Sequence, residues 1–391
     1  ALAAQSPLAQ GKEKFLGSIH SSSQVVNFEQ YWNQVTPENA GKWGSVEGTR
    51  DSYNWTALDA AYDFAKDNGF PFRYHVLLWG NQQPAWIETL SEEDQLEEIG
   101  EWMDAVADRY PDIDYLEVIN EPINDPPNGA GNGDYYLALG GRGTSGFEWL
   151  LNGYRMARER FPNTKLVINE YNILNNPNRA STYMKIVELL KEESLVDIIG
   201  VQAHAFTTTA ENAVLEGVLD QLATTGLPIM ITEMDIDGPT DAEQLTQYKR
   251  IFPLLWEHPS VMGITLWGYR PGLWRNAEKA YLIDTDGSER PALTWLREYV
   301  EETDLSPKPL QSNLRRATIY PNPAEEYFTI LGDEEVQSLR MVDLTGKEVL
   351  SVNQVENRRI NVPQNITSGC YLVQLVFGSG ERLVERIKIK K

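Results

Sequence analysis

The sequence predicts an α/β protein, a (β/α)8 TIM barrel followed by a small all-β sandwich domain. Up to about residue 313, short β-rich runs alternate with longer amphipathic segments, which is typical of strand-helix units around a parallel sheet. Eight such units can be counted, and about 300 residues is a suitable length for a complete eight-fold barrel. Beyond them, short strands follow one another without helices, which favours a separate β-sandwich.

The barrel strands are expected where β-branched and aromatic residues gather between Gly, Pro and Asn. They cover residues 14–17, 34–36, 72–78, 115–120, 165–169, 198–202, 229–233 and 261–267. The intervening helices are expected at residues 55–68, 91–110, 147–161, 183–193, 213–224 and 242–257, with a last helix at 292–301. Ser91 precedes three acidic residues, a favourable start for a helix because its dipole attracts negative charge.

The domain organisation follows from composition and charge. We predict an N-terminal tail at residues 1–11, the barrel at 12–305, a Pro-containing linker at 306–313 and the sandwich at 314–391. The last segment carries 11 Lys and Arg against 10 Asp and Glu, so the first 313 residues hold −24 of the total charge of −23. Seven sandwich strands are expected, at residues 317–320, 327–331, 339–343, 348–352, 359–362, 371–377 and 382–389.

The bulk composition excludes several classes of partner. A net charge of −23 argues against nucleic acid and against anionic membranes, because both would be repelled. No apolar run approaches the roughly 20 residues that cross a bilayer, so membrane insertion is not expected. The single Cys370 rules out an internal disulfide. The chain opens without Met or an apolar signal core, which suits a trimmed mature form or a recombinant product, and we expect a monomer.

Two predicted strands end on a glutamate. The apolar run 115–119 stops at Asn120, Glu121 and Pro122, and a second run stops at Glu233, 112 residues later. In a parallel barrel both side chains would face the same mouth. One strand-end glutamate is more often a cap or a loop anchor, but two carboxyl groups in one cleft are what glycoside hydrolysis requires. The pair therefore predicts a glycosidase.

Polar and aromatic residues gather just after the other strands, as expected of a binding cleft. They are Glu38, Asn39, Lys42, His75, Trp79, Gln82, Tyr171, Gln202, His204, Trp267 and Trp274, with Asp235 and Arg275 beside them. His75 suits a structural hydrogen-bonding role as well as an acid or base, whereas His204 is placed to orient Glu233. No spacing matches a zinc site, and the Gly-rich segment 129–146 lacks the Lys of a phosphate loop. That segment is either a loop over the aglycone side of the cleft or a mobile surface loop.

Residues of roughly 12–303 resemble a family 10 glycoside hydrolase, an endo-β-1,4-xylanase, through separated motifs in the same order. The resemblance implies that Glu121 is the acid/base and Glu233 the nucleophile, with Asn120 on the sugar 2-hydroxyl. It also implies glycone contacts from Glu38, Asn39 and Lys42, and subsites before the cleaved bond lined by His75, Trp79 and Gln82. Tyr171 corresponds to the tyrosine of the fifth-strand motif, and Gln202, His204 and Asp235 are implied to support the nucleophile. Trp267 and Trp274 are implied to cover the sugar at the cleaved bond.

The sequence also departs from the family pattern. Gly80 stands where a second histidine is common, and the loop between Trp267 and Trp274 is about one residue short. The tail resembles the C-terminal sorting domain of the type IX secretion system, through Tyr320-Pro321-Asn322-Pro323, the segment 343–347 and a basic end. This implies export to the cell surface or the medium and an interaction with the secretion machinery. A carbohydrate-binding module is the alternative for the tail.

The resemblance implies retaining hydrolysis of xylan and xylo-oligosaccharides through a covalent glycosyl-enzyme, with carboxyl groups about 5 to 5.5 Å apart. This chemistry needs no cofactor and no metal. A β-1,4- or mixed-linkage glucanase is the enzymatic alternative, decided by the room that Trp267 and Trp274 leave for a hydroxymethyl group. A sugar-binding barrel without catalysis is the alternative from another class, and the presence of both carboxyl groups argues against it.

Overall fold

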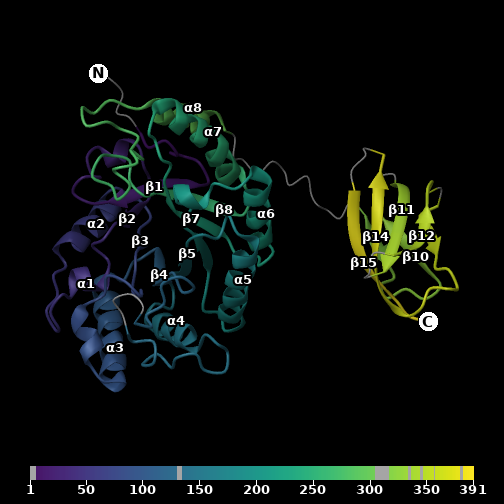
Figure 1. Ribbon diagram of the computed structural model, residues 1–391, viewed down its shortest axis with the longest axis horizontal. Coiled ribbons are helices and arrows are strands. Elements are labelled where there is room, and N and C mark those ends of the chain that lie inside the picture. Colours follow the sequence, from purple (N-terminus) through teal and green to yellow (C-terminus); the bar gives the residue numbers. More distant parts are fainter. Residues whose placement is uncertain are drawn as a thin grey trace. The chain divides into compact units, whose positions relative to one another are not determined.

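The computed structural model describes residues 6–129, 134–303, 317–332, 336–343, 347–355, 357–378 and 382–391. It divides into two compact units, residues 1–305 and 306–391 (Figure 1). The predicted linker at 306–313, residues 130–133 of the Gly-rich segment and residues 344–346 of the tail motif lie outside the described residues. No described helix is long and apolar enough to span a membrane.

The first unit is the predicted TIM barrel. Its eight parallel strands are β1 (Phe15–His20), β2 (Val35–Pro37), β3 (Arg73–Tyr74), β4 (Tyr115–Asn120), β5 (Lys165–Glu170), β6 (Ile198–Val201), β7 (Ile229–Met234) and β8 (Val261–Leu266). They pair in the order β2-β1-β8-β7-β6-β5-β4-β3, and a parallel bridge between Val35 and Phe72 joins the two ends of the sheet. All eight carboxyl ends therefore point to one mouth.

Helices surround the strands (Figure 1). They are α1 (Trp43–Val46), α2 (Thr56–Asp67), α3 (Glu92–Arg109), α4 (Glu148–Arg160), α5 (Pro177–Glu192), α6 (Asn212–Ala223), α7 (Asp241–Glu257) and α8 (Pro291–Glu302), with short 3-10 turns at Phe28–Gln30, Ala85–Thr89 and Ala205–Thr207. Ser91 caps α3 as expected, accepting from the amide of Asp94 at 3.2 Å. The start predicted for α5 at residue 183 was wrong by six residues: Asn176 caps the helix and Pro177 opens it, because proline suits the first turn, where its missing N–H costs no bond.

Two further differences concern the barrel wall. The strand expected at 72–78 pairs continuously only at Arg73–Tyr74, although the amides of Leu77 and Leu78 still bond to Glu117 and Val118 of β4 at 3.1 and 3.0 Å. The segment expected to be a tail includes Leu8 and Ala9, which are buried in the barrel's hydrophobic core. Apolar burial ties this segment to the barrel.

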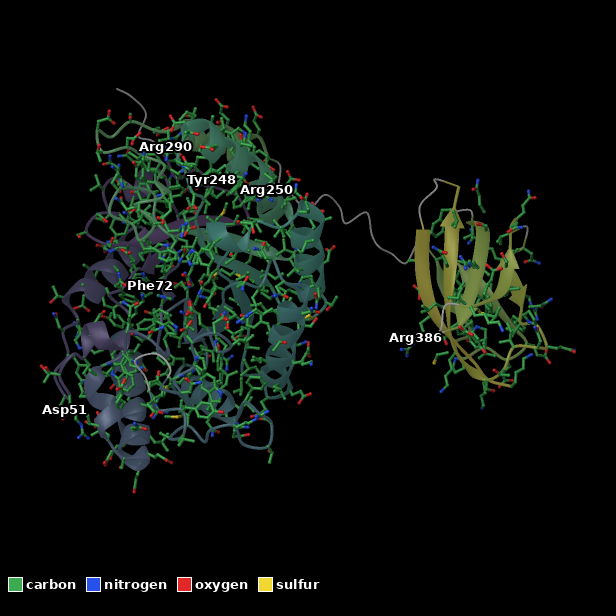
Figure 2. The ribbon with its side chains drawn as sticks, in the orientation of Figure 1. Asp51, Phe72, Tyr248, Arg250, Arg290 and Arg386 are labelled. Atoms are coloured by element: carbon green, nitrogen blue, oxygen red, sulfur yellow. The ribbon has the colours of Figure 1, made fainter. Side chains whose placement is uncertain are left out.

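Buried side chains fill the barrel interior, and Figure 2 shows the side chains on the ribbon. Phe72, beside β3, and Tyr248, on α7, are both buried in the core, whereas Asp51 lies exposed at the surface. Deletion of a large core side chain of this kind costs about 3 to 5 kcal/mol in other proteins. The packed interior thus gives the residues at the mouth a rigid base.

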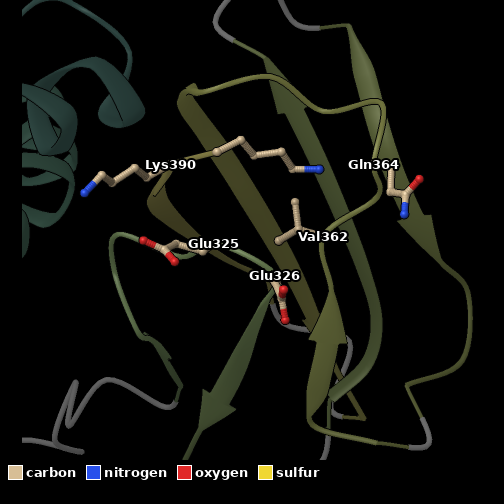
Figure 3. A pocket seen from close by; sticks show the side chains of 6 residues that line it. Glu325, Glu326, Val362, Gln364 and Lys390 are labelled. Carbon is tan, nitrogen blue, oxygen red and sulfur yellow. The ribbon is translucent and has the colours of Figure 1, made fainter.

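The second unit is all-β, as predicted. Its strands are β9 (Thr318–Tyr320), β10 (Tyr327–Leu331), β11 (Val336–Asp343), β12 (Glu348–Val352), β13 (Arg359–Asn361), β14 (Gly369–Phe377) and β15 (Arg382–Ile389). They form two antiparallel sheets, β13-β10-β9 and β12-β11-β14-β15, which share a hydrophobic core including Phe328, Met341 and Val373. A pocket of about 560 Å³ opens on this unit (Figure 3), lined by Glu325, Glu326, Val362, Gln364, Lys390 and Lys391.

Candidate active site

The carboxyl ends of the barrel strands surround a cleft of about 590 Å³. All fourteen residues predicted to be catalytic or substrate-binding line it: Glu38, Asn39, Lys42, His75, Trp79, Gln82, Asn120, Glu121, Tyr171, Gln202, His204, Glu233, Trp267 and Trp274. Asp235 and Arg275, predicted to be supporting residues, are in contact with this set from outside the lining. The structure thus gathers residues from seven different strand ends in one place.

Glu121 follows the last residue of β4 and turns sharply into the cleft. Its backbone φ is +54°, in the left-handed region that non-glycine residues rarely occupy, and its amide donates to the carbonyl of Asn169 at 2.9 Å. Trp79 Nε1 donates to Oε2 at 2.8 Å and Gln202 Nε2 to Oε1 at 2.6 Å. Burial, followed by the negative charge of Glu233, raises the pKa of Glu121 well above its ordinary value. This carboxyl group is therefore suited to hold a proton near neutral pH.

Glu233 lies within β7, and its surroundings lower its pKa, whereas those of Glu121 raise it. Asn169 Nδ2 donates to its Oε1 at 2.7 Å, and His204 Nε2 lies 3.3 Å from its Oε2. Burial alone would raise the pKa of Glu233, but the His204 hydrogen bond and nearby positive charges, including Arg73, outweigh it and lower the pKa to about 2. Above about pH 2, Glu233 is therefore ionised while Glu121, with its raised pKa, can still hold its proton.

His204 links Glu233 to a second carboxylate. Its Nδ1 lies 2.6 Å from Oδ2 of Asp235, which also accepts from Trp274 Nε1 at 3.1 Å. Burial would lower the pKa of His204, but the charges and hydrogen bonds of Asp235 and Glu233 prevail and raise it to about 10. Arg275 forms a two-bond pair with Asp237 at 2.8 and 2.7 Å and stays within 3.7 Å of Asp235. The nucleophile candidate thus has a cationic imidazole beside it, held by a buried aspartate.

One amide joins the two halves of the site. Asn169 Nδ2 lies within hydrogen-bond distance of Glu233, of Asn120 Oδ1 (3.0 Å) and of Glu117 Oε1 (3.2 Å). Its own Oδ1 accepts from the Thr232 hydroxyl at 2.7 Å, and because the carboxylates of Glu233 and Glu117 can only accept, the NH2 end of the amide faces them. Asn120 Oδ1 thus accepts from Asn169, which also donates to Glu233, and lies 3.5 Å from the Gln202 amide that donates to Glu121.

Below the cleft lies a buried ion-pair network. Arg73 and Glu117 are joined at 2.6 Å with no exposed side-chain surface, and His75 Nδ1 lies 3.1 Å from the same carboxylate oxygen. The ligand atoms of His75, Glu117 and Glu233 lie within 4.8 Å of one another, a spacing that a metal could use. Arg73 and Asn169 already donate to these carboxylates, so a cation would have to displace them. The arrangement fits a charge network better than a metal site.

The part of the cleft around Lys42 is polar. Lys42 Nζ donates to Asn39 Oδ1 at 2.8 Å and to Gln82 Oε1 at 2.6 Å, and it lies 5.1 Å from the ring centroid of Trp79. Burial lowers the pKa of Lys42 and raises that of the neighbouring Glu38. These side chains offer several donors and acceptors suited to sugar hydroxyl groups.

Aromatic rings form the remaining walls. Trp267 is only 6% exposed and packs edge-on against His75 with ring centroids 5.2 Å apart, whereas Trp274 is 51% exposed. Phe206, which lines the cleft but was not predicted from the sequence, is 46% exposed and stacks on His204 at 5.6 Å. Its ring also meets Trp274 at 6.3 Å and Tyr171 at 6.4 Å. Exposed rings around a polar cleft are suited to the apolar faces of sugars.

Comparison with known proteins decides the family. Residues 7–299 match the profile of Glycosyl hydrolase family 10. The chain is a member of glycoside hydrolase family 10. An endo-1,4-beta-xylanase B of Cellvibrio japonicus (strain Ueda107) is 37% identical over 290 residues, which cover 73% of this chain and 45% of that relative. The chain thus spans less than half the length of that protein.

Other relatives agree with this assignment. An endo-1,4-beta-xylanase 3 of Hypocrea jecorina (strain QM6a) is 31% identical, covering 66% of this chain and 73% of its own. The crystal structure of native xylanase 10B from Thermotoga maritima superposes with a TM-score of 0.66 at 25% identity, covering 75% of this chain and 97% of its own. Residues 318–390 match a secretion system C-terminal sorting domain. The type IX sorting tail is confirmed, and it indicates export to the cell surface or beyond.

Two details of this family 10 site differ from the sequence expectation. Gln202 was expected to support Glu233, and its carbonyl accepts from the Glu233 amide at 3.0 Å, but its side-chain amide donates to Glu121 at 2.6 Å. Gly80 replaces the common second histidine for a steric reason. A Cβ there would lie 2.1 Å from the carbonyl oxygen of Asp125, so the chain after Glu121 fills the space that a side chain would need.

Several residues of the family 10 site were given no role from the sequence, although Asn81, Asn169 and Glu170 lie in the polar clusters that follow the strands. They are Arg73, Asn81, Glu117, Asp125, Asn169, Glu170 and Phe206. Asn169 and Glu170 carry the same signal as Asn120 and Glu121, since a β-rich run ends on an amide and a carboxyl group. Arg73 and Glu117 carry no such signal, because charged residues inside a strand usually face solvent.

Proposed function

We propose that the barrel is a retaining endo-β-1,4-xylanase that acts as a monomer on xylan and xylo-oligosaccharides. The observation that carries the proposal is that two buried carboxyl groups line one cleft with different partners. Trp79 and Gln202 donate to Glu121, whose pKa is raised, whereas Asn169 and His204 contact Glu233, whose pKa is lowered to about 2. A retaining glycosidase needs one protonated acid and one ionised nucleophile. The names of the family 10 relatives supply the substrate class.

In the first step, Glu233 attacks the anomeric carbon while Glu121 gives its proton to the leaving glycosidic oxygen. The covalent glycosyl-enzyme forms as that bond breaks. The protonated His204, held by Asp235, orients Glu233 and stabilises its charge in the free enzyme. Asn120 lines the same cleft as the two glutamates, where its amide can bond to the sugar 2-hydroxyl as positive charge develops on the ring.

In the second step, Glu121 is ionised and removes a proton from water, which attacks the same carbon and releases Glu233. Once Glu233 is esterified, its charge no longer raises the pKa of Glu121, which favours the change from acid to base. Gln202 and Trp79 both donate to Glu121 and stabilise its ionised form. The remaining predicted contacts, from Glu38, Asn39, Lys42, His75 and Gln82, are proposed to bind the glycone sugars.

A reducing-sugar assay on xylan and on mixed-linkage β-glucan tests the substrate class. We expect release from xylan to exceed release from the glucan, and proton NMR to show the β-anomer first. Preferential release from the glucan would assign the alternative glucanase activity. Binding of xylan without release by the wild-type protein would assign the non-catalytic reading instead.

A further inference from the structure

A third strand-end carboxyl group, besides Glu121 and Glu233, binds the segment that follows the acid/base candidate. Glu170 is the last residue of β5, is fully buried and does not line the cleft. Its Oε2 accepts from the amide of Ile123 at 2.8 Å, and its Oε1 accepts from Asn124 Nδ2 at 2.6 Å and from the amide of Tyr171 at 2.8 Å. Two of these three donors belong to the segment that directly follows Glu121.

The conformation of that segment decides where the Glu121 carboxyl group points. Glu121 has a φ of +54°, which has to be held by its surroundings because an L-residue gains nothing from it locally. The amide of Asp125 donates to the carbonyl of Glu121 at 2.8 Å and closes the turn. Glu170 fixes the middle of the same turn at Ile123 and Asn124.

We propose that Glu170 is a positioning residue for the acid/base Glu121, which it holds in place through the turn of residues 121–125. The proposal rests on the function proposed above for Glu121. Glu170 does not touch the reacting atoms, so it acts only through the turn. An ionised carboxylate is needed for this, because it offers acceptors on both oxygens, whereas a protonated one would turn an O–H toward one of the N–H donors.

The charged and titratable groups around Glu170 come from three elements. Glu121 and Asp125 lie on the turn, Tyr171 follows β5, and Arg179 and Tyr183 face it from α5. Burial raises the pKa of Glu170 to about 7, against the hydrogen bonds from Ile123, Tyr171 and Asn124 and the charge of Arg179. Arg179 Nε has no hydrogen-bond partner among the described residues, so Arg179 affects the pKa of Glu170 through its charge and not through a hydrogen bond from Nε. Loss of the Glu170 charge in mildly acidic solution would loosen the turn.

The test is Glu170→Gln, which keeps the shape but directs an amide N–H at an N–H donor. We expect kcat/KM on xylan to fall about 10-fold or more, as small misplacements of catalytic groups do. On an aryl xylobioside with a good leaving group, whose first step needs little acid, we expect kcat/KM within about 3-fold of the wild type. Asn124→Ala, which removes one donor from the other side, should show the same pattern more weakly and serves if Glu170→Gln does not fold.

The matched control is Glu47→Gln. Glu47 is another buried carboxyl group, accepting from Trp43 Nε1 at 2.7 Å and from the amide of Asp51 at 2.8 Å, and it does not line the cleft. Its loss should lower Tm without separating the two substrates. Equal losses on both substrates for Glu170→Gln and Asn124→Ala, or no loss on either, would overturn the positioning role. Absence of xylanase activity in the wild type would instead refute the proposed function.

Discussion

Gln202 Nε2 lies 2.6 Å from Oε1 of Glu121, so a residue after β6 supports the carboxyl group that β4 supplies. The donated hydrogen bond favours the ionised form of Glu121 and opposes the burial that raises its pKa. The pKa of Glu121 is therefore set by two opposing effects: desolvation raises it, and the hydrogen bond donated by Gln202 lowers it. This balance sets the upper pH at which it can still supply a proton.

Gln202→Leu should shift that balance. Without the donated bond the ionised form of Glu121 loses stabilisation, so its pKa rises further and the basic limb of the kcat/KM profile on xylan moves to higher pH. We expect a shift of about one pH unit, the value of one charge-assisted hydrogen bond. Profiles between pH 4 and 10 measure it. A shift to lower pH would show that Gln202 does not stabilise the carboxylate.

The two glutamates should separate on an activated aryl xylobioside. Glu121→Ala should lose about 10²- to 10⁴-fold in kcat on xylan, where leaving-group protonation is needed, and still release a burst of phenol from the aryl substrate. Glu233→Ala should give no burst, since no covalent intermediate can form. Both residues lie at strand ends rather than inside the packed core, so both variants should remain folded. A burst from Glu233→Ala, or none from Glu121→Ala, would reverse or refute the two roles.

Asp235→Asn tests the link between Asp235, His204 and Glu233. Without the charge of Asp235 the pKa of His204, about 10 in the wild type, should fall, so the cationic imidazole beside Glu233 is lost at a lower pH. Because that imidazolium orients Glu233, the basic limb of kcat/KM should move to lower pH. An unchanged basic limb would show that the charge of His204 does not contribute to turnover.

The contact between His204 and Asp235 also predicts how the stability of the barrel depends on pH. The pKa of His204 is raised on folding from about 6.5 to about 10, so its contribution to the free energy of unfolding is complete below pH 6.5 and is lost as pH rises toward 10. In Asp235→Asn the loss of barrel Tm between pH 6 and pH 9.5 should therefore be smaller than in the wild type. Equal losses in both proteins would remove His204 as the cause.

Much of this site could be predicted because each strand end carries its own local signal. Glu121 and Glu233 each close a β-rich run, and neighbouring strands bring such ends together whatever the details of packing. The partner of Gln202 could not be predicted, because it depends on the register of β6 against its neighbours. The Arg73–Glu117 pair depends on two strands 44 residues apart and on burial that no local pattern shows. Phe206 reaches the cleft only because residues 205–207 form a 3-10 turn after His204.

Phe206→Ala should weaken the binding of polymer. The ring lies exposed on the cleft wall between Tyr171 and Trp274, where a sugar face can pack, so KM on xylan should rise about 3- to 10-fold, the equivalent of roughly 1 kcal/mol of aromatic contact. Phe206→Tyr should restore KM. Because the ring also stacks on His204, the acidic limb of the pH profile is the control and should stay unchanged. A rise in KM that Phe206→Tyr does not restore would assign the ring to packing alone.

Removal of the sorting unit should leave hydrolysis intact. Every residue placed in or behind the cleft lies within the unit of residues 1–305, and the described strands of the second unit share their own hydrophobic core. A chain ending after Ser312, within the proposed linker, should therefore match the full chain in kcat and KM on soluble xylan. In a host with the type IX system, the shortened chain should remain inside the cell while the full chain is exported. If truncation spares export but weakens binding to insoluble xylan, the second unit works as a carbohydrate-binding module in this protein.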